Sequence, residues 1–338
     1  MNDSTHHLSA NYFIECIEQD SHDEATEYLE RVETASTEKR KATVRALRPL
    51  ANDDPSALKP LVSTLTAFLG DDERSIRLTT AKLFVAIAET DPDAVVPMVP
   101  ALGERLGDDE EFYYVRARSA EALGYVARDH PGTVASPEVV ADLQVGLSFD
   151  EPEVKEKLAK ALEHIALGDP TRLKHQVATL ATHLDDESEL VRYHLCTVLA
   201  VVGCESPETL TDADGALVAR LDDESTHVRR RAAEALGLLI LATTEESSIR
   251  ESILDDLKEQ KVDSESFFRR RKRFALGAVN GAVGSSEVEA EIGTVEGIRA
   301  TTGDAVAEIT SPDGECPHCG LALPETSPPM CPRCGGPH

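Results

Sequence analysis

The stretch VRARSAEALGYVARDHP, residues 115–131, recurs along this chain in diverged form. The copies begin at Lys39, Ile76, Val115, Val154, Val191, Val228 and Phe268. From the second copy to the sixth the spacings are 39, 39, 37 and 37 residues. Near-constant spacing of this length is the signature of a repeat architecture, in which each unit buries its apolar face against the next.

Three columns of the alignment describe one face of a helix. Eight residues after each start stands a large apolar side chain: Leu47, Phe84, Leu123, Leu162, Leu199, Leu236 or Leu276. One helical turn later the chain has Leu50, Ile87, Val126, Ile165, Val202, Leu239 or Val279. Five residues after the start it has a smaller residue, Val44, Ala81, Ala120, Ala159, Cys196 or Ala233, which the seventh copy replaces with Arg273. This spacing predicts an apolar helical stripe with close helix contacts.

The segments between these helices complete the unit. Acidic turns such as GDDERS and DDESTH precede several copies, where Asp and Ser can cap a helix. Before each turn lies a second apolar-periodic segment, and after most copies comes Asp-Pro, His-Pro or Ser-Pro, which stops the helix. With 4% aromatic residues and no Trp, the core suits close-packed helices. We therefore expect an all-α protein built from helix, acidic turn, helix and proline turn.

In unit length and in its Asp, Val-Arg and Ala-Leu placement, the chain resembles the HEAT repeats. The resemblance covers residues 21–281. It implies a right-handed α-α superhelix of about seven repeats, with the second helix of each unit on the concave side. It also implies that a column of basic residues forms an internal ladder with the acidic turns. The members of that column are Arg40, Arg77, Arg116, Lys155, Arg192, Arg229 and Arg269.

The rest of the chain falls outside the repeats. Residues 1–20 form an N-terminal segment, and residues 282–314 read as an acidic linker. Gly and Thr break any helical period there, so we expect a flexible tether, with short strands near 288–292 and 306–309 as the alternative.

Residues 315–338 contain four cysteines in two tight pairs. Cys316, Cys319, Cys331 and Cys334 follow the pattern C-x2-C-x11-C-x2-C. Two such pairs offer four thiolates to one tetrahedral ion, which predicts a small zinc ribbon holding one structural Zn²⁺. Redox-active dithiols and a rubredoxin-like iron centre are the alternatives. Cys16, Cys196 and Cys204 are scattered in helical sequence, like small buried hydrophobic residues.

Charge and hydropathy exclude some classes of function. The formal net charge of −28 argues against general affinity for nucleic acid or anionic lipid. No apolar run is long enough to span a membrane, and the first residues do not read as a signal peptide, so we expect a cytoplasmic protein. The excess of Asp and Glu, with more Arg than Lys, resembles proteins of salt-loving archaea.

Two basic clusters stand out in this acidic chain. They are Arg229, Arg230 and Arg231 in the sixth copy and Arg269, Arg270, Arg271, Lys272 and Arg273 in the seventh. One interpretation is a polar cap, because the final repeat has no successor to pack against and a terminal repeat needs a polar outer face. The other is a docking patch for an acidic segment of a protein partner, in which Arg230 and Arg270 point toward the concave opening.

No phosphate loop, nucleophile elbow or metalloprotease motif occurs, so we expect no catalysis. The leading hypothesis is a protein-binding scaffold or adaptor that uses the concave face, with the ribbon as a second contact module. A role in signalling or motility follows by resemblance, since archaeal taxis systems employ HEAT-like adaptors. The alternatives are a nucleic-acid-associated regulator that uses the Arg-rich repeats and ribbon, and an enzyme of the HEAT-like bilin lyase group. The sequence does not indicate an oligomeric state.

Overall fold

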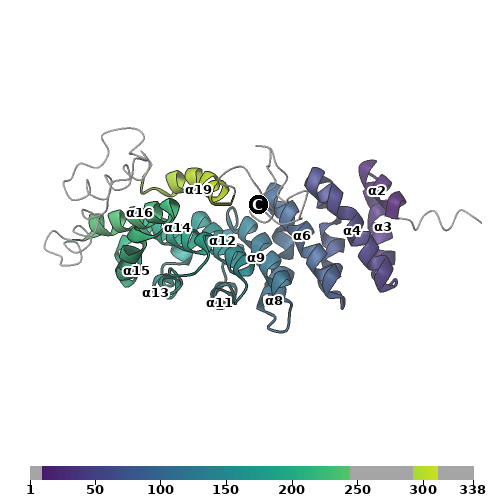
Figure 1. Cartoon of the computed structure of the whole chain (residues 1–338). Helices are drawn as coiled ribbons and strands as arrows, with labels where there is room; N and C mark the ends of the chain where they lie inside the picture. The colour runs from purple at the N-terminus through teal and green to yellow at the C-terminus, as the bar shows by residue number, and fades with distance from the viewer. Residues whose placement is uncertain (1–9, 244–291, 311–338) are drawn as a thin grey trace, which may run out of the picture. The chain divides into compact units, whose positions relative to one another are not determined.

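The computed structural model describes residues 10–243 and 292–310 (Figure 1). Every secondary-structure element in these ranges is helical, as the sequence predicts. The chain divides into two compact units, Met1–His164 and Ile165–His338, which we call unit 1 and unit 2. The basic cluster at 269–273 and the four paired cysteines lie outside the described residues.

Unit 1 begins with two helices before the regular repeats, α2 (Ala10–Glu18) and α3 (His22–Glu33). The α2 residue Phe13 is fully buried, and its ring stacks on that of Tyr28 from α3 with centroids 4.7 Å apart. The N-terminal segment therefore includes a helix that closes one end of the core of this unit.

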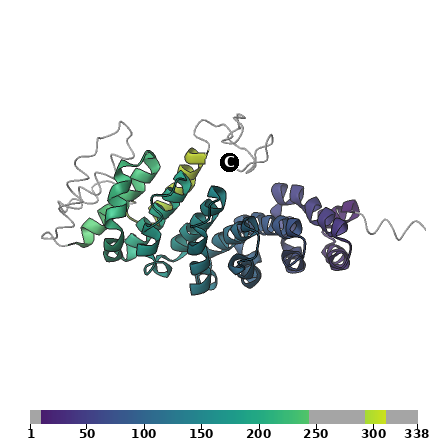
Figure 2. The same cartoon turned by 60° about the horizontal axis from the view of Figure 1, so that its bottom comes forward.

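The six regular repeats in the described ranges each end in a long helix. These long helices are α4 (Thr37–Asp53), α6 (Arg74–Thr90), α9 (Tyr113–Ala127), α12 (Pro152–Gly168), α14 (Glu189–Glu205) and α16 (Thr226–Ala242). In unit 1, α4 packs on α6 and α6 on α9, and in unit 2 α14 packs on α16. Figure 2 shows consecutive long helices stacked side by side within each unit.

Shorter helices connect the long ones. In unit 1 they are η1 (Pro55–Leu61), α5 (Val62–Leu69), α7 (Pro92–Val95), η2 (Val96–Met98), α8 (Val99–Gly107), α10 (Pro131–Val134) and α11 (Pro137–Gly146). In unit 2 they are η3 (Pro170–Arg172), α13 (Val177–Ala181), η4 (Pro207–Ala213), α15 (Asp214–Ala219) and η5 (Arg220–Asp222).

The proline turns are helical, which the sequence analysis did not foresee. Pro55, Pro92 and Pro170 each occupy the first turn of a short helix, where the missing N–H is no loss. The preceding aspartate caps that helix; for example, Asp54 Oδ1 accepts a hydrogen bond from the backbone N–H of Ser56 at 3.2 Å. At each of these prolines a short helix therefore precedes the two helices that the sequence predicts for the repeat.

The three predicted columns form the core. Leu47, Phe84, Leu123, Leu162, Leu199 and Leu236 are all completely buried, as is every member of the small column from Val44 to Ala233. Leu50 is the exception in the third column, since it is half-buried beside Pro49 in α4. The apolar stripe therefore lies where its period predicts.

Side chains of the acidic turns cap the long helices. Ser188 Oγ accepts from the backbone N–H of Val191, and Ser225 Oγ accepts from that of Val228. Two residues before the second cap, Asp223 accepts from the backbone N–H of Ser225 at 2.9 Å. This hydrogen bond fixes the turn, and the Asp223 carboxylate also contacts the preceding repeat.

The linker expectation is wrong for residues 295–310. They form a helix, α19 (Val295–Thr310), in which residues 306–309 are helical rather than strand. Its first turn is capped by Thr294 Oγ1, which accepts from the backbone N–H of Gly297 at 3.1 Å. Gly and Thr have poor helix propensity, and tertiary packing against α14 overrides that propensity.

Within residues 10–243 and 292–310, none of the helices has the length and apolar character needed to cross a membrane.

Candidate functional site: the long-helix face

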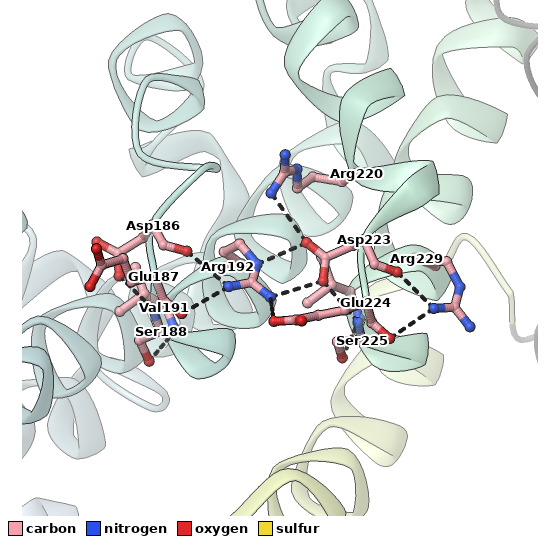
Figure 3. A network of polar contacts seen from close by, with 11 residues as sticks. Asp186, Glu187, Ser188, Val191, Arg192, Arg220, Asp223, Glu224, Ser225 and Arg229 are labelled. Carbon is pink, nitrogen blue, oxygen red and sulfur yellow. Dashed lines mark hydrogen bonds and ion pairs between the residues drawn. The ribbon is translucent and has the colours of Figure 1, made fainter.

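Three members of the basic column, Arg40, Arg77 and Arg192, form the expected internal ladder, shown for Arg192 in Figure 3. Arg192 donates from Nε and Nη2 to the two carboxylate oxygens of Asp223, at 2.8 and 2.9 Å. Its Nη1 donates to the carbonyl oxygens of Asp186 and Glu187, at 2.9 and 3.0 Å. The side chains of Arg192 and Asp223 are 5% and 2% exposed, so this bidentate ion pair connects one turn to the next and is almost completely shielded from solvent.

Other members of the column make the same bridge with local changes. Arg40 pairs with Asp71 at 2.6 Å, and Arg77 pairs with Glu111 at 2.6 Å. Arg116 departs from the pattern: it donates to the carbonyl of Leu106 and lies over the ring of Phe149, 5.0 Å from its centroid. At Arg40, Arg77 and Arg192 the column therefore joins one repeat to the next.

Three residues of the predicted docking patch, Arg229, Arg230 and Arg231, lie within the described ranges. Arg229 donates to the carbonyls of Asp223 and Glu224 in its own turn, at 2.7 and 3.0 Å. Arg231 is 2% exposed, so it is not available to a partner in this structure. Arg230 is half-buried. Since consecutive residues of an α-helix point about 100° apart, Arg230 and Arg231 point in different directions, and Arg231 is the one that contacts α19.

Arg231 holds α19 in place. Its Nη1 pairs with Glu234 at 2.9 Å. Its Nη2 lies 3.2 Å from the carbonyl oxygen of Ile298 and 3.0 and 3.1 Å from the hydroxyls of Thr301 and Thr302. A guanidinium with several donors in a fixed plane suits such a set of neutral oxygens.

Further contacts attach the rest of α19 to the same unit. Glu234 Oε1 accepts from the backbone N–H of Gly293 at 3.0 Å; the φ of 78° at that residue favours glycine. Arg299 donates to the carbonyl of Leu167, and His227 lies 3.3 Å from Glu308. Figures 1 and 2 show α19, in yellow, alongside the long helices of its unit.

The docking of α19 is shallow. Of its 16 residues, three are buried: Gly297, Ile298 and Thr302. Ile298 is fully buried, and the other two are small. The helix is therefore held by one apolar side chain and a set of polar contacts from the long helices.

A second group of charged side chains lies on the long helices of unit 1. We call Lys82, Arg118, Glu121, Lys157 and Lys160 the Glu121 cluster. Arg118 Nη1 lies 2.6 Å from Glu121 Oε2, while Lys157 and Lys160 lie 2.9 and 3.7 Å from Glu121 Oε1. The Glu121 side chain is 5% exposed. One buried carboxylate thus meets three cations.

Close packing of two long helices assembles this cluster. A Cβ atom at Gly124 in α9 would lie 2.9 Å from the Cα of Ala161 in α12, closer than real side chains approach. Glycine therefore allows α12 near enough for Lys157 to reach Glu121. Lys160 donates to the hydroxyl of Tyr125 at 2.8 Å.

The electrostatics of the cluster are dominated by positive charge. Burial alone would raise the pKa of Glu121, but Lys157, Lys160 and Arg118 outweigh it and hold that pKa below its usual value. Burial lowers the pKa of Lys82, and the charges of Arg118 and Arg48 lower it further. Lys82 has no ion pair or hydrogen bond with any described residue. The ammonium of Lys82 therefore lacks a hydrogen-bonded carboxylate among the described residues.

Sequence reasoning missed the contact of Arg231 with α19 and the Glu121 cluster, although the alignment of the copies shows a pattern that is common to the two. Three and six residues after the start, the third copy has Arg118 and Glu121, and the sixth has Arg231 and Glu234. Reading these columns as one face of the long helix would have separated Arg231 from the basic run around it.

The unpaired cysteines fit their expected role in part. Cys16 and Cys196 are buried, and Cys204 is half-buried. Across the described part of the chain, no group of three or more His, Cys, Asp or Glu side chains could hold a metal ion. The predicted zinc ligands Cys316, Cys319, Cys331 and Cys334 lie outside that part.

Comparison with known proteins places the chain by its fold. No family model matches it, and no curated protein matches it. A designed armadillo repeat protein aligns with 65% of this chain and 100% of its own, with a TM-score of 0.56 and 20% identity. An engineered protein solved by a structural genomics consortium aligns with 85% of this chain and 78% of its own, with a TM-score of 0.66 and 20% identity.

A designed armadillo repeat protein in complex with the peptide (KR)4 aligns with 65% of this chain and 99% of its own, with a TM-score of 0.57 and 20% identity. At these identities the likeness concerns the fold alone. The chain has a helical-repeat solenoid fold similar to that of armadillo and other designed repeat proteins.

Proposed function

We propose that this protein is a protein-binding scaffold that holds segments of partner proteins on the face of its long helices. The observation that carries the proposal is α19. This helix is attached to unit 2 by side chains of the long helices that reach its backbone and hydroxyl groups, with Ile298 as its buried apolar anchor. A face that binds a segment of its own chain in this way has the chemistry to bind a segment of another.

The structural neighbours support the same reading. One of them is a designed repeat protein in complex with a peptide, (KR)4, so a fold of this kind can hold a peptide. Repeat proteins present such segments with a long, regular surface, since each repeat contributes equivalent positions.

We further propose that the C-terminal cysteines form a zinc ribbon that acts as a second contact module. The support is the donor set itself, four thiolates in two closely spaced pairs, which suits a closed structural Zn²⁺ site. Since no catalytic motif accompanies the repeats, the proposal includes no enzymatic activity. An adaptor in the cytoplasm of a salt-loving archaeon would fit the acidic composition, and signalling or motility is the proposed setting.

A peptide-library selection against the full-length chain tests the scaffold proposal. We expect selected peptides to share a pattern and to bind with one-to-one stoichiometry by isothermal titration calorimetry. Bound peptides should leave the helical circular dichroism signal unchanged, because the long helices are already formed. Failure to enrich any peptide above background, at both low and molar salt, would contradict the proposal.

A further inference from the structure

The two units carry the same charged pair at the same position of the repeat. Arg118 and Glu121 in unit 1 stand three and six residues after the start of their copy, as Arg231 and Glu234 do in unit 2. In each pair Nη1 of the arginine contacts Oε2 of the glutamate, at 2.6 Å in unit 1 and 2.9 Å in unit 2. The pairs therefore present equivalent groups on their long helices.

In unit 2 this pair is engaged by a polypeptide segment. Arg231 Nη2 contacts oxygens of α19, and Glu234 Oε1 accepts from the backbone of Gly293. In unit 1, within the described residues, Arg118 forms one ion pair, with Glu121, and its other donors have no acceptor. Glu121 Oε1 is engaged by Lys157 instead of a backbone N–H.

The equivalent site in unit 1 differs in charge. Lys82, Arg118, Lys157 and Lys160 supply four positive charges around the single negative charge of Glu121, an excess of three. Counting also Glu89, which accepts a hydrogen bond from Tyr125 at 2.8 Å, the excess is two. This excess lies in a chain whose net charge is −28, so it is a local feature and not a property of the surface as a whole.

We propose that the face of α6, α9 and α12 around the Glu121 cluster binds an acidic segment of a partner protein, at the position equivalent to the one that α19 occupies in unit 2. This inference rests on the proposed scaffold function and adds the chemistry of the partner. Carboxylates of the segment pair with Arg118, Lys82 and Lys160, while Glu121 keeps its contact with Lys157.

Charge complementarity selects an acidic occupant over others. A basic segment would add to the existing positive excess, and an apolar one would bury Lys82 and Arg118 without acceptors, at a desolvation cost. Side chains of Arg118, Lys157 and Lys160 are 17, 21 and 23% exposed, so pairs formed there are partly shielded from solvent. Shielded pairs should keep part of their strength in molar salt, where the Debye length is about 3 Å.

The test uses fluorescein-labelled decaglutamate as the probe and the full-length chain as the binder. Fluorescence anisotropy at about 0.15 M and about 1 M KCl gives the Kd for the wild type and for the Lys82→Gln/Lys160→Gln double variant. A double variant is chosen because Arg118 and Lys157 still neutralise Glu121. Lys174→Gln, in the loop between η3 and α13, is the matched control for loss of a lysine.

We expect decaglutamate to bind the wild type and Lys174→Gln equally, and to bind the double variant at least about fivefold more weakly, which is about 1 kcal/mol at 1.4 kcal/mol per tenfold step. Unchanged helicity and unfolding midpoint would show that the double variant is folded. Equal affinity for all three chains overturns the inference.

Other occupants of this face give different results. Tighter binding of a labelled single-stranded decathymidylate, with the same loss in the double variant, would overturn a protein partner in favour of nucleic acid. Loss of self-association in the double variant, seen by sedimentation, would overturn it in favour of a second copy of this chain. Absence of decaglutamate binding, while library-selected peptides still bind, overturns the acidic segment but leaves the scaffold function standing.

Discussion

Truncating Ile298 should release α19 while the repeats stay folded. Ile298 is fully buried, and it is the large apolar side chain among the three buried residues of α19. Replacing a buried isoleucine with alanine costs about 2–5 kcal/mol. At about 1.4 kcal/mol per factor of ten, the equilibrium for docking of α19 should fall roughly 30- to 4,000-fold in Ile298→Ala.

Hydrogen exchange measured by mass spectrometry reads this out directly. Amides in α19 should lose protection in Ile298→Ala, since an isolated helix of this length is marginal in water. Amides in α14 and α16 should keep theirs, because their own core columns are untouched. Val145→Ala is the matched control: Val145 is 59% exposed, so its truncation should change stability by no more than about 0.5 kcal/mol.

Two results would refute the reasoning. If Ile298→Ala leaves the exchange of α19 unchanged, Ile298 does not anchor the helix. If protection falls equally in α14, α16 and α19, the helix is an integral part of the fold of unit 2 and not a segment docked on it.

Three further predictions concern the ladder, the Glu121 cluster and the cysteines. Asp223→Ala should destabilise the chain by up to about 3–5 kcal/mol in urea unfolding, because it removes the bidentate partner of the buried Arg192 and leaves only the exposed Glu224, 3.4 Å away, as a carboxylate partner; Arg192→Met/Asp223→Ala should cost less than the sum of the two single changes, and additive costs would contradict a direct pair. Burial raises the pKa of Glu121, but three cations hold it below its usual value, so the folded chain binds fewer protons than the unfolded chain as the pH falls. The stability that Glu121 contributes should therefore be present above about pH 4.3, its unperturbed pKa, and be lost below it; Glu121→Gln should flatten this acid dependence in denaturant titrations, and an unchanged slope would contradict it. Elemental analysis should find about one zinc per chain, lost in Cys316→Ser with the helical circular dichroism signal intact; a wild type without zinc, or a large loss of helicity in the variant, would show that the ribbon is wrongly assigned.

The sequence predicts the parts of the fold that repeat. The column that contains Leu123 is buried because each copy presents the same apolar position to the same neighbour. The pair of Arg192 and Asp223 was equally foreseeable, since a basic column and an acidic turn recur at fixed spacing. Averaging over copies makes such features visible without any homologue.

Features that occur once were not predictable in this way. Residues 295–310 contain Gly and Thr at positions that weaken any helical period, and the helix forms against a partner surface that is distant in sequence. Arg231 contacts Ile298 across a separation of 67 residues. Local propensity carries no information on such a contact, so the segment reads as a tether.

The prolines illustrate a different limit. Pro55 and Pro170 do end the preceding long helix, as predicted, but each also begins a short helix. Proline is compatible with both roles. Without an N–H it cannot continue the hydrogen bonds of the preceding helix, and the first turn of the next helix does not require that N–H. The aspartate before each proline, a good N-cap, was the available sign that a new helix begins there.

Hydrogen exchange of the full-length chain with and without a library-selected peptide tests the central claim most directly. If the long-helix face is the binding surface, the peptide should slow exchange in the long helices, such as α6, α9 or α14, and should leave α8, α11 and α15 unchanged. Protection confined to those shorter helices, with the long helices unaffected, would contradict the account.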